Sequence, residues 1–147
     1  MILEPVIALA AWTLVMCLWM YATRLPGMLK ANVDPDSLAR DPDASLDKLL
    51  PPQTQWKAHN FNHLHEAPTV FYAVMLSMAL LATQASFSLN DEQLIALVGW
   101  VYVVLRIAHS IVQATWNRVV VRFALFSLSQ VALVVLVGLA IYTGATF

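Results

Sequence analysis

Polar and ionisable side chains recur at helical spacing in two segments of an otherwise apolar chain. The first polar set lies three or four residues apart: His59, Asn62, His63 and Glu66. The second polar set has the same spacing: Tyr102, Arg106, His109 and Gln113. Residues so spaced share one face of a helix. Cationic and neutral donors on such faces can bind an anion, and a cation beside a thiol favours its reactive thiolate.

Arg106 is the most informative of these residues, because it lies inside the apolar run from Leu94 to Val112. A guanidinium stays charged, so it is costly at membrane depth unless a partner or a water-filled cavity receives it. One interpretation pairs it with Glu66 in a buried ion pair that only locks the helices together. However, two or three arginines and three histidines surround this single carboxylate, which favours an anionic ligand carrying carboxylates or a thiolate.

Two other interpretations concern metal ions and the membrane surface. His59, His63 and Glu66 could present three metal ligands along one helix. We expect no metal, because nearby arginines would repel a cation and no second carboxylate would balance its charge. Arg118 and Arg122 could be interface anchors, as basic residues at helix ends often are, and for Arg118 this is the favoured interpretation.

The elements that position these residues are predicted to be membrane-spanning helices. The chain has 147 residues, of which 60% are hydrophobic and 12% charged, which excludes an ordinary cytosolic domain. We predict an all-α integral membrane protein, an antiparallel four-helix bundle in a single domain covering 1–147, with Asn90 capping the third helix. The expected helices are 2–24, 56–85, 91–113 and 117–143, with a cytoplasmic loop at 25–55.

The basic residues indicate the orientation of these helices. Seven of the eight Lys and Arg residues lie in or beside the first and third connections, and the connection at 86–93 has none. By the positive-inside rule, both termini face outward and both polar sets lie in the cytoplasmic half of the membrane, most simply a bacterial inner membrane. A net charge of −1 predicts no nucleic-acid partner, and the single Cys17 excludes an internal disulfide.

Two motifs resemble a known family. The segments "HNFNHLHEAPTVFYAV" and "LRIAHSIVQATWNRVVVRF", with the four-helix layout, resemble the MAPEG family, the membrane-associated proteins of eicosanoid and glutathione metabolism, in a bacterial-type branch. The resemblance covers Trp56 to Phe126 and implies a homotrimer. It also implies that glutathione, or another low-molecular-weight thiol, binds as co-substrate between subunits near the cytoplasmic face.

The resemblance also implies roles for individual residues. Glu66 corresponds to a glutamate that helps to hold the tripeptide, and Arg122 to the arginine that stabilises the thiolate at the start of the fourth helix. Arg106 and His109 correspond to an Arg-x-x-His/Tyr face on the third helix.

Three residue types depart from the pattern that the resemblance leads us to expect, and the proline follows Glu66 by two residues rather than three. The family has arginine at His59, asparagine at His63 and tyrosine at Gln113. The first change removes a permanent bidentate partner for a carboxylate, and the third removes a hydroxyl donor.

These observations lead to one functional hypothesis and two alternatives. We expect a glutathione transferase or peroxidase that acts on a lipophilic electrophile from the bilayer, with Arg122 as the catalytic residue. The alternatives are a non-catalytic lipid- or ligand-binding protein on the same scaffold, and a small transporter or accessory subunit. Expected partners are further copies of the chain, lipids and a hydrophobic small molecule. The expected binding residues are His59, Asn62, His63, Glu66, Arg106, His109 and Gln113.

Overall fold

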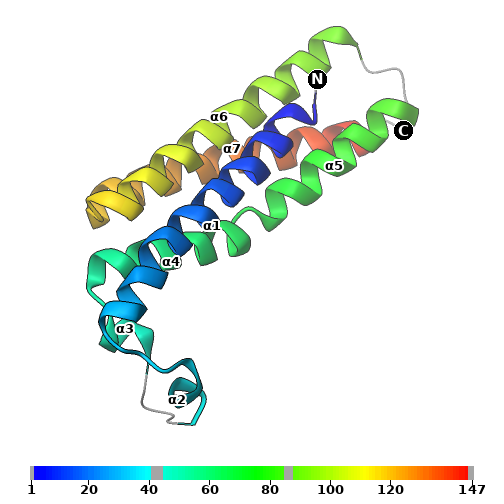
Figure 1. Cartoon of the computed structure of the whole chain (residues 1–147). Helices are drawn as coiled ribbons and strands as arrows, with labels where there is room; N and C mark the ends of the chain where they lie inside the picture. The colour runs from blue at the N-terminus through cyan, green and yellow to red at the C-terminus, as the bar shows by residue number, and fades with distance from the viewer. Residues whose placement is uncertain (1, 41–44, 85–87, 146–147) are drawn as a thin grey trace.

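The computed structural model describes residues 2–40, 45–84 and 88–145, and in this part of the chain the fold is all-helical. Figure 1 shows long helices lying side by side, with short helices beyond one end of the bundle. In chain order the helices are α1 (Glu4–Lys30), α2 (Pro35–Arg40), α3 (Leu46–Leu49), α4 (Pro52–Glu66), α5 (Thr69–Gln84), α6 (Leu89–Thr115) and α7 (Val119–Ala145).

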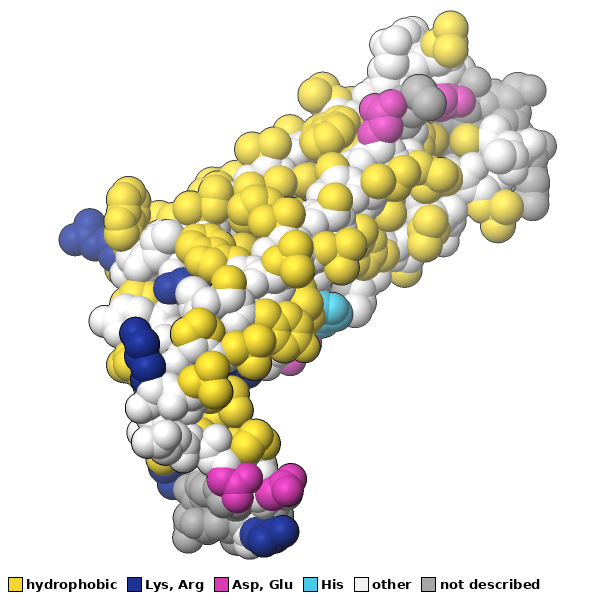
Figure 2. All heavy atoms as spheres, in the orientation of Figure 1, with side chains coloured by type: hydrophobic (Ala, Val, Ile, Leu, Met, Phe, Trp, Pro, Cys, Tyr) yellow, Lys and Arg dark blue, Asp and Glu magenta, His cyan; other side chains and the backbone are white. Residues whose placement is uncertain are grey.

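Within the described residues, four helical stretches are long and apolar enough to cross a membrane, which confirms the predicted all-helical membrane class. A span needs about 20 apolar residues, and a helix satisfies its backbone groups internally where water is absent. Figure 2 shows apolar side chains along the length of the bundle, with Lys and Arg gathered at the end that carries α2 and α3. The stretches are Glu4–Lys30, Pro52–Thr83, Leu89–Thr115 and Val119–Thr143.

The first helix runs to Lys30 rather than ending at residue 24. The helix continues past the apolar run and through Pro26, whose missing N–H leaves one hydrogen bond of the ladder unmade. It stops where Asn32 adopts a left-handed φ of 48° and the Val33 N–H donates to the Met28 carbonyl at 3.1 Å. This is a usual way to satisfy the last carbonyls of a helix.

The second span is interrupted, whereas the sequence predicted one helix over 56–85. α4 ends at Glu66 and α5 begins at Thr69. Pro68 has no N–H, and its ring clashes with the carbonyl four residues earlier, so the α-helical ladder breaks before it. The ladder resumes where the Tyr72 N–H donates to the Pro68 carbonyl at 3.0 Å. The break separates the polar α4 from the apolar α5.

The N-cap of α6 is Ser88 rather than Asn90. The Ser88 hydroxyl accepts the Asp91 N–H at 3.2 Å, and the Asp91 carboxylate accepts the Ser88 N–H at 3.3 Å. This reciprocal pair satisfies two donors that a helix start leaves open. Asn90 therefore lies within the first turn, and α6 begins two residues earlier than predicted.

α6 is the central helix of the bundle. It packs on α1 and α4, and most extensively on α7, whereas α5 packs on α7. Close approach depends on Gly99, where an added Cβ would lie 2.9 Å from the Met75 Cε and 3.2 Å from the Pro5 Cγ. Deeper in the core, the rings of Phe71 and Tyr102 stack with centroids 4.3 Å apart. This packing fixes which face of α6 is buried.

Candidate functional site

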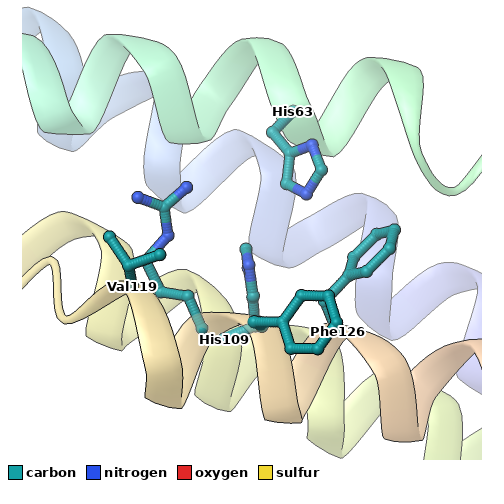
Figure 3. A pocket seen from close by; sticks show the side chains of 6 residues that line it. His63, His109, Val119 and Phe126 are labelled. Carbon is teal, nitrogen blue, oxygen red and sulfur yellow. The ribbon is translucent and has the colours of Figure 1, made fainter.

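An open pocket of about 260 Å³ lies between α4, α6 and α7. Figure 3 shows the His63 ring pointing from α4 toward His109 on α6 and Phe126 on α7. The ring centroids of His63 and His109 are 5.2 Å apart, and those of His63 and Phe126 are 5.6 Å apart. The pocket is lined by His63, His109, Val119, Arg122, Phe123 and Phe126.

Arg106 lies behind this pocket and is 0% exposed. Its Nη1 is 3.5 Å from the His63 Nε2, and its Nη2 is 3.5 Å from the His63 carbonyl oxygen. Its guanidinium carbon is 5.6 Å from the centroid of the Phe126 ring. The contacts are long and none of these partners is anionic, so the buried charge of Arg106 is not neutralised by a contacting carboxylate in the described part of the chain.

The hypothesised ion pair between Arg106 and Glu66 does not form in the chain. Glu66 is the last residue of α4, and its side chain is exposed. Among the described residues, the carboxylate of Glu66 has no ion pair with Arg106 or with any other cation. The interpretation of Arg106 as half of a buried pair is therefore wrong for the single chain.

His59 contacts the connecting segment rather than the pocket. Its Nε2 lies 3.1 Å from the Asp47 Oδ1, and about half of each side chain is exposed, 51% and 57%. This pair joins α4 to α3. Asn62 on the same helix is also exposed. Of the first polar set, only His63 lines the pocket.

The second polar set is buried as a whole. The exposed fractions are 0% for Tyr102 and Arg106, 3% for His109 and 5% for Gln113. Each has a buried polar atom without a hydrogen-bond partner among the described residues: the Tyr102 hydroxyl, Arg106 Nε, His109 Nδ1 and Gln113 Oε1. Buried polar atoms are usually satisfied, so this face is unusual and suited to a polar role.

The sequence did not predict a buried polar contact between Asn60 on α4 and Ser110 on α6. Asn60 is 0% exposed, and its Nδ2 donates to the Ser110 hydroxyl. The Trp12 indole N–H donates to the same oxygen at 3.0 Å. This contact ties α4 and α1 to α6 beside His109. The spacing of three residues between Asn60 and His63 is the signal in the sequence that places both on one side of α4.

Asn117 is a second missed residue, and it positions Arg122. Asn117 adopts a left-handed φ of 51°, and its N–H donates to the Val112 carbonyl at 2.7 Å. Asparagine tolerates this conformation better than most residues. Its side-chain oxygen accepts a hydrogen bond from the Arg122 Nη1. Arg118 in the same turn is exposed and does not line this pocket.

The lining combines two imidazoles and a guanidinium with three apolar side chains, and it contains no carboxylate. Such a lining suits an anionic atom attached to an apolar group.

No group of three or more His, Cys, Asp and Glu side chains within residues 2–40, 45–84 and 88–145 is arranged to hold a metal ion. Because His59 contacts Asp47, it is not available beside His63 as a second ligand.

Comparison with known families gives one match. The MAPEG family model matches residues 2–142, which is nearly the whole chain. The search of curated proteins and the search of solved structures gave no match. The match covers every residue that lines the pocket and, apart from Thr143 at the end of the fourth, all the membrane-capable stretches. The chain is therefore a membrane protein that belongs to the MAPEG family.

Proposed function

We propose that this protein is a membrane-bound thiol transferase or peroxidase that joins a thiol to a lipophilic electrophile. The thiol is glutathione or another low-molecular-weight thiol, bound near the cytoplasmic face. The assembly is a homotrimer of antiparallel four-helix subunits with outward-facing termini. Membership of the MAPEG family, which includes glutathione transferases and peroxidases, supports this class.

The observation that carries the proposal is the positive pocket with an apolar wall. His63, His109 and Arg122 line it without a carboxylate, and the buried charge of Arg106 lies behind it. In a site of low dielectric, fixed donors and cations favour the thiolate over the thiol. The pocket is therefore suited to hold the reactive form of a thiol beside an apolar co-substrate.

Each side chain of the pocket then has a role. Arg122 stabilises the thiolate through the nitrogens that Asn117 does not use. Arg106 adds positive potential and holds His63 in place. Phe123 is 69% exposed and offers the electrophile an apolar path from the bilayer.

The exposed members of the first polar set require a different role. His59, Asn62 and Glu66 point away from the pocket of their own chain. In the proposed trimer, a neighbouring subunit would cover this side of α4, and these residues would hold the charged ends of the thiol there. Gln113 is buried one turn beyond His109 on α6 and does not line the pocket, so we give it a supporting role.

The alternative is a non-catalytic lipid- or ligand-binding protein on the same scaffold. The observation that favours it is the engagement of His59 with Asp47, at a position where the family resemblance leads us to expect a carboxylate-binding arginine. Without an arginine that binds a carboxylate at this position, the protein would keep the pocket but lose part of its affinity for a tripeptide.

The test is a titration of reduced glutathione into the purified protein in detergent. We expect a thiolate absorbance that Arg122→Ala removes and Arg118→Ala retains, because only Arg122 lines the pocket. The absence of binding up to about 1 mM, the upper end of ordinary Michaelis constants, would contradict the enzyme. Binding without conjugation of any electrophile would support the alternative.

A further inference from the structure

The two nitrogens of His109 have different surroundings. The ring lines the pocket, and its side chain is only 3% exposed. The Nδ1 atom is buried and has no hydrogen-bond partner in the described part of the chain. The Nε2 atom makes no hydrogen bond with the described residues and is not fully buried, so it is the nitrogen that remains for a ligand in the pocket that the ring lines.

These surroundings select one protonation state. A neutral imidazole carries one N–H and one lone pair. A buried N–H without an acceptor is among the rarest defects in proteins, so the lone pair belongs on Nδ1 and the hydrogen on Nε2. A doubly protonated ring would leave the Nδ1–H unsatisfied and would add a third positive charge beside Arg106 and Arg122.

In His63 the other ring nitrogen carries the hydrogen. Its Nε2 faces the Nη1 of Arg106 at 3.5 Å, and a guanidinium nitrogen can only donate. The lone pair of His63 is therefore on Nε2 and its hydrogen on Nδ1. The His63 lone pair thus faces Arg106, and the His109 lone pair is on a buried nitrogen. From α7, Arg122 faces the pocket with donors alone, and on α1 the neighbouring Trp12 is not titratable.

We propose that His109 donates a hydrogen bond from its neutral Nε2–H to the anionic atom of the ligand, and that the pocket contains no general base. His109 and Arg122 then both donate hydrogen bonds to the same anionic atom. This inference rests on the proposed function only in identifying that atom as thiolate sulfur. When a thiol binds, its S–H bond breaks, the electron pair stays on sulfur and the proton passes to water.

The protonation state can be tested without any ligand. Histidine labelled with nitrogen-15 in the full-length protein in detergent reports the tautomer of each ring by NMR, and loss of signals in His109→Gln and His63→Gln assigns the two rings. We expect a neutral Nε2–H form for His109 and a neutral Nδ1–H form for His63 at neutral pH. An imidazolium, or an Nδ1–H form of His109, would overturn the proposal.

The donor role is tested with glutathione. His109→Leu removes the donor and should weaken thiolate formation by about 10- to 100-fold, as expected for a hydrogen bond to a charged group. His109→Gln restores an N–H donor but cannot act as a base, so it should stay near the wild type. His65→Leu is the matched control, because His65 is exposed and contacts the Phe61 carbonyl on α4. A His109→Gln variant as weak as His109→Leu would contradict the donor role.

Proton release separates a donor from a base. Calorimetry in two buffers with different heats of ionisation should show about one proton released to water per glutathione bound near neutral pH, if the bound thiol is fully ionised. S-Methylglutathione has no thiol and should release none. Thiolate formation without release would mean that a pocket residue keeps the proton, which would overturn the proposal. A failure of glutathione to bind would refute the proposed function, whereas the NMR measurement would still decide the role of His109.

Discussion

Both polar sets follow helical periodicity in the sequence, but their environments in the structure differ. All four members of the second polar set are buried in α6, whereas in the first polar set only His63 faces the pocket from α4. The difference follows from position, because α6 is surrounded by α1, α4 and α7. Helical spacing thus identifies a shared face, but the neighbouring helices decide whether that face becomes a site.

The largest effect is expected for Arg106→Met, which changes the buried polar set of α6 and so tests this comparison directly. The apolar replacement fills a similar volume and removes a buried charge without a contacting anion, so the free energy of unfolding should be unchanged or rise by about 1–4 kcal/mol. Thiolate formation should fall by at least about tenfold, since a cation beside the pocket is lost. Chemical denaturation and glutathione titration measure the two effects.

Arg118→Met is the matched control, because Arg118 is exposed and should change neither property. Unfolding of Arg106→Met would show instead that the buried guanidinium holds the bundle together. Glu66→Gln gives an independent check, since an exposed carboxylate without an ion pair should alter stability by no more than about 0.5 kcal/mol.

The second prediction concerns the two asparagines of α4. Asn60→Ala leaves the buried Ser110 hydroxyl with one donor fewer and should lower the free energy of unfolding by about 1–3 kcal/mol. Asn62→Ala alters an exposed side chain and should change it by less than about 0.5 kcal/mol. Equal effects of the two variants in thermal or chemical denaturation would contradict the assignment of Asn60 to the buried side and Asn62 to the exposed side of α4.

The third prediction compares the glycines of α6 and α7. Gly99→Ala places a Cβ against the Pro5 ring and the Met75 side chain and should cost about 1–2 kcal/mol of stability. Gly138→Ala meets nothing within 4 Å and should stabilise the helix by up to about 1 kcal/mol. Denaturation of both variants in the same detergent measures the difference. A stabilising Gly99→Ala would contradict the central position of α6.

The sequence predicted the all-helical membrane class and the shared face of the second polar set, because length, apolar composition and helical spacing are local properties. It missed the break at Pro68, which was read as part of a continuous span. It also missed Asn60 and Asn117, whose roles depend on which residues face a neighbouring helix or a turn. The contact between His59 and Asp47 could not be predicted either. It joins α4 to α3, which lies in a segment without the periodic pattern that would indicate its position.

The smallest effect is expected at His59. It shows whether the exposed side of α4 only holds α3 or also contacts the thiol. His59→Ala removes a half-exposed contact and should lower the free energy of unfolding by no more than about 1 kcal/mol. Asp47→Asn should lower it by a similar amount, and the double variant should add little, because both changes remove the same contact. If His59 serves only to hold α3, both single variants bind glutathione equally well. If it also contacts the thiol across a subunit boundary, His59→Ala alone weakens glutathione binding, and the exposed side of α4 then belongs to the site of the assembled protein.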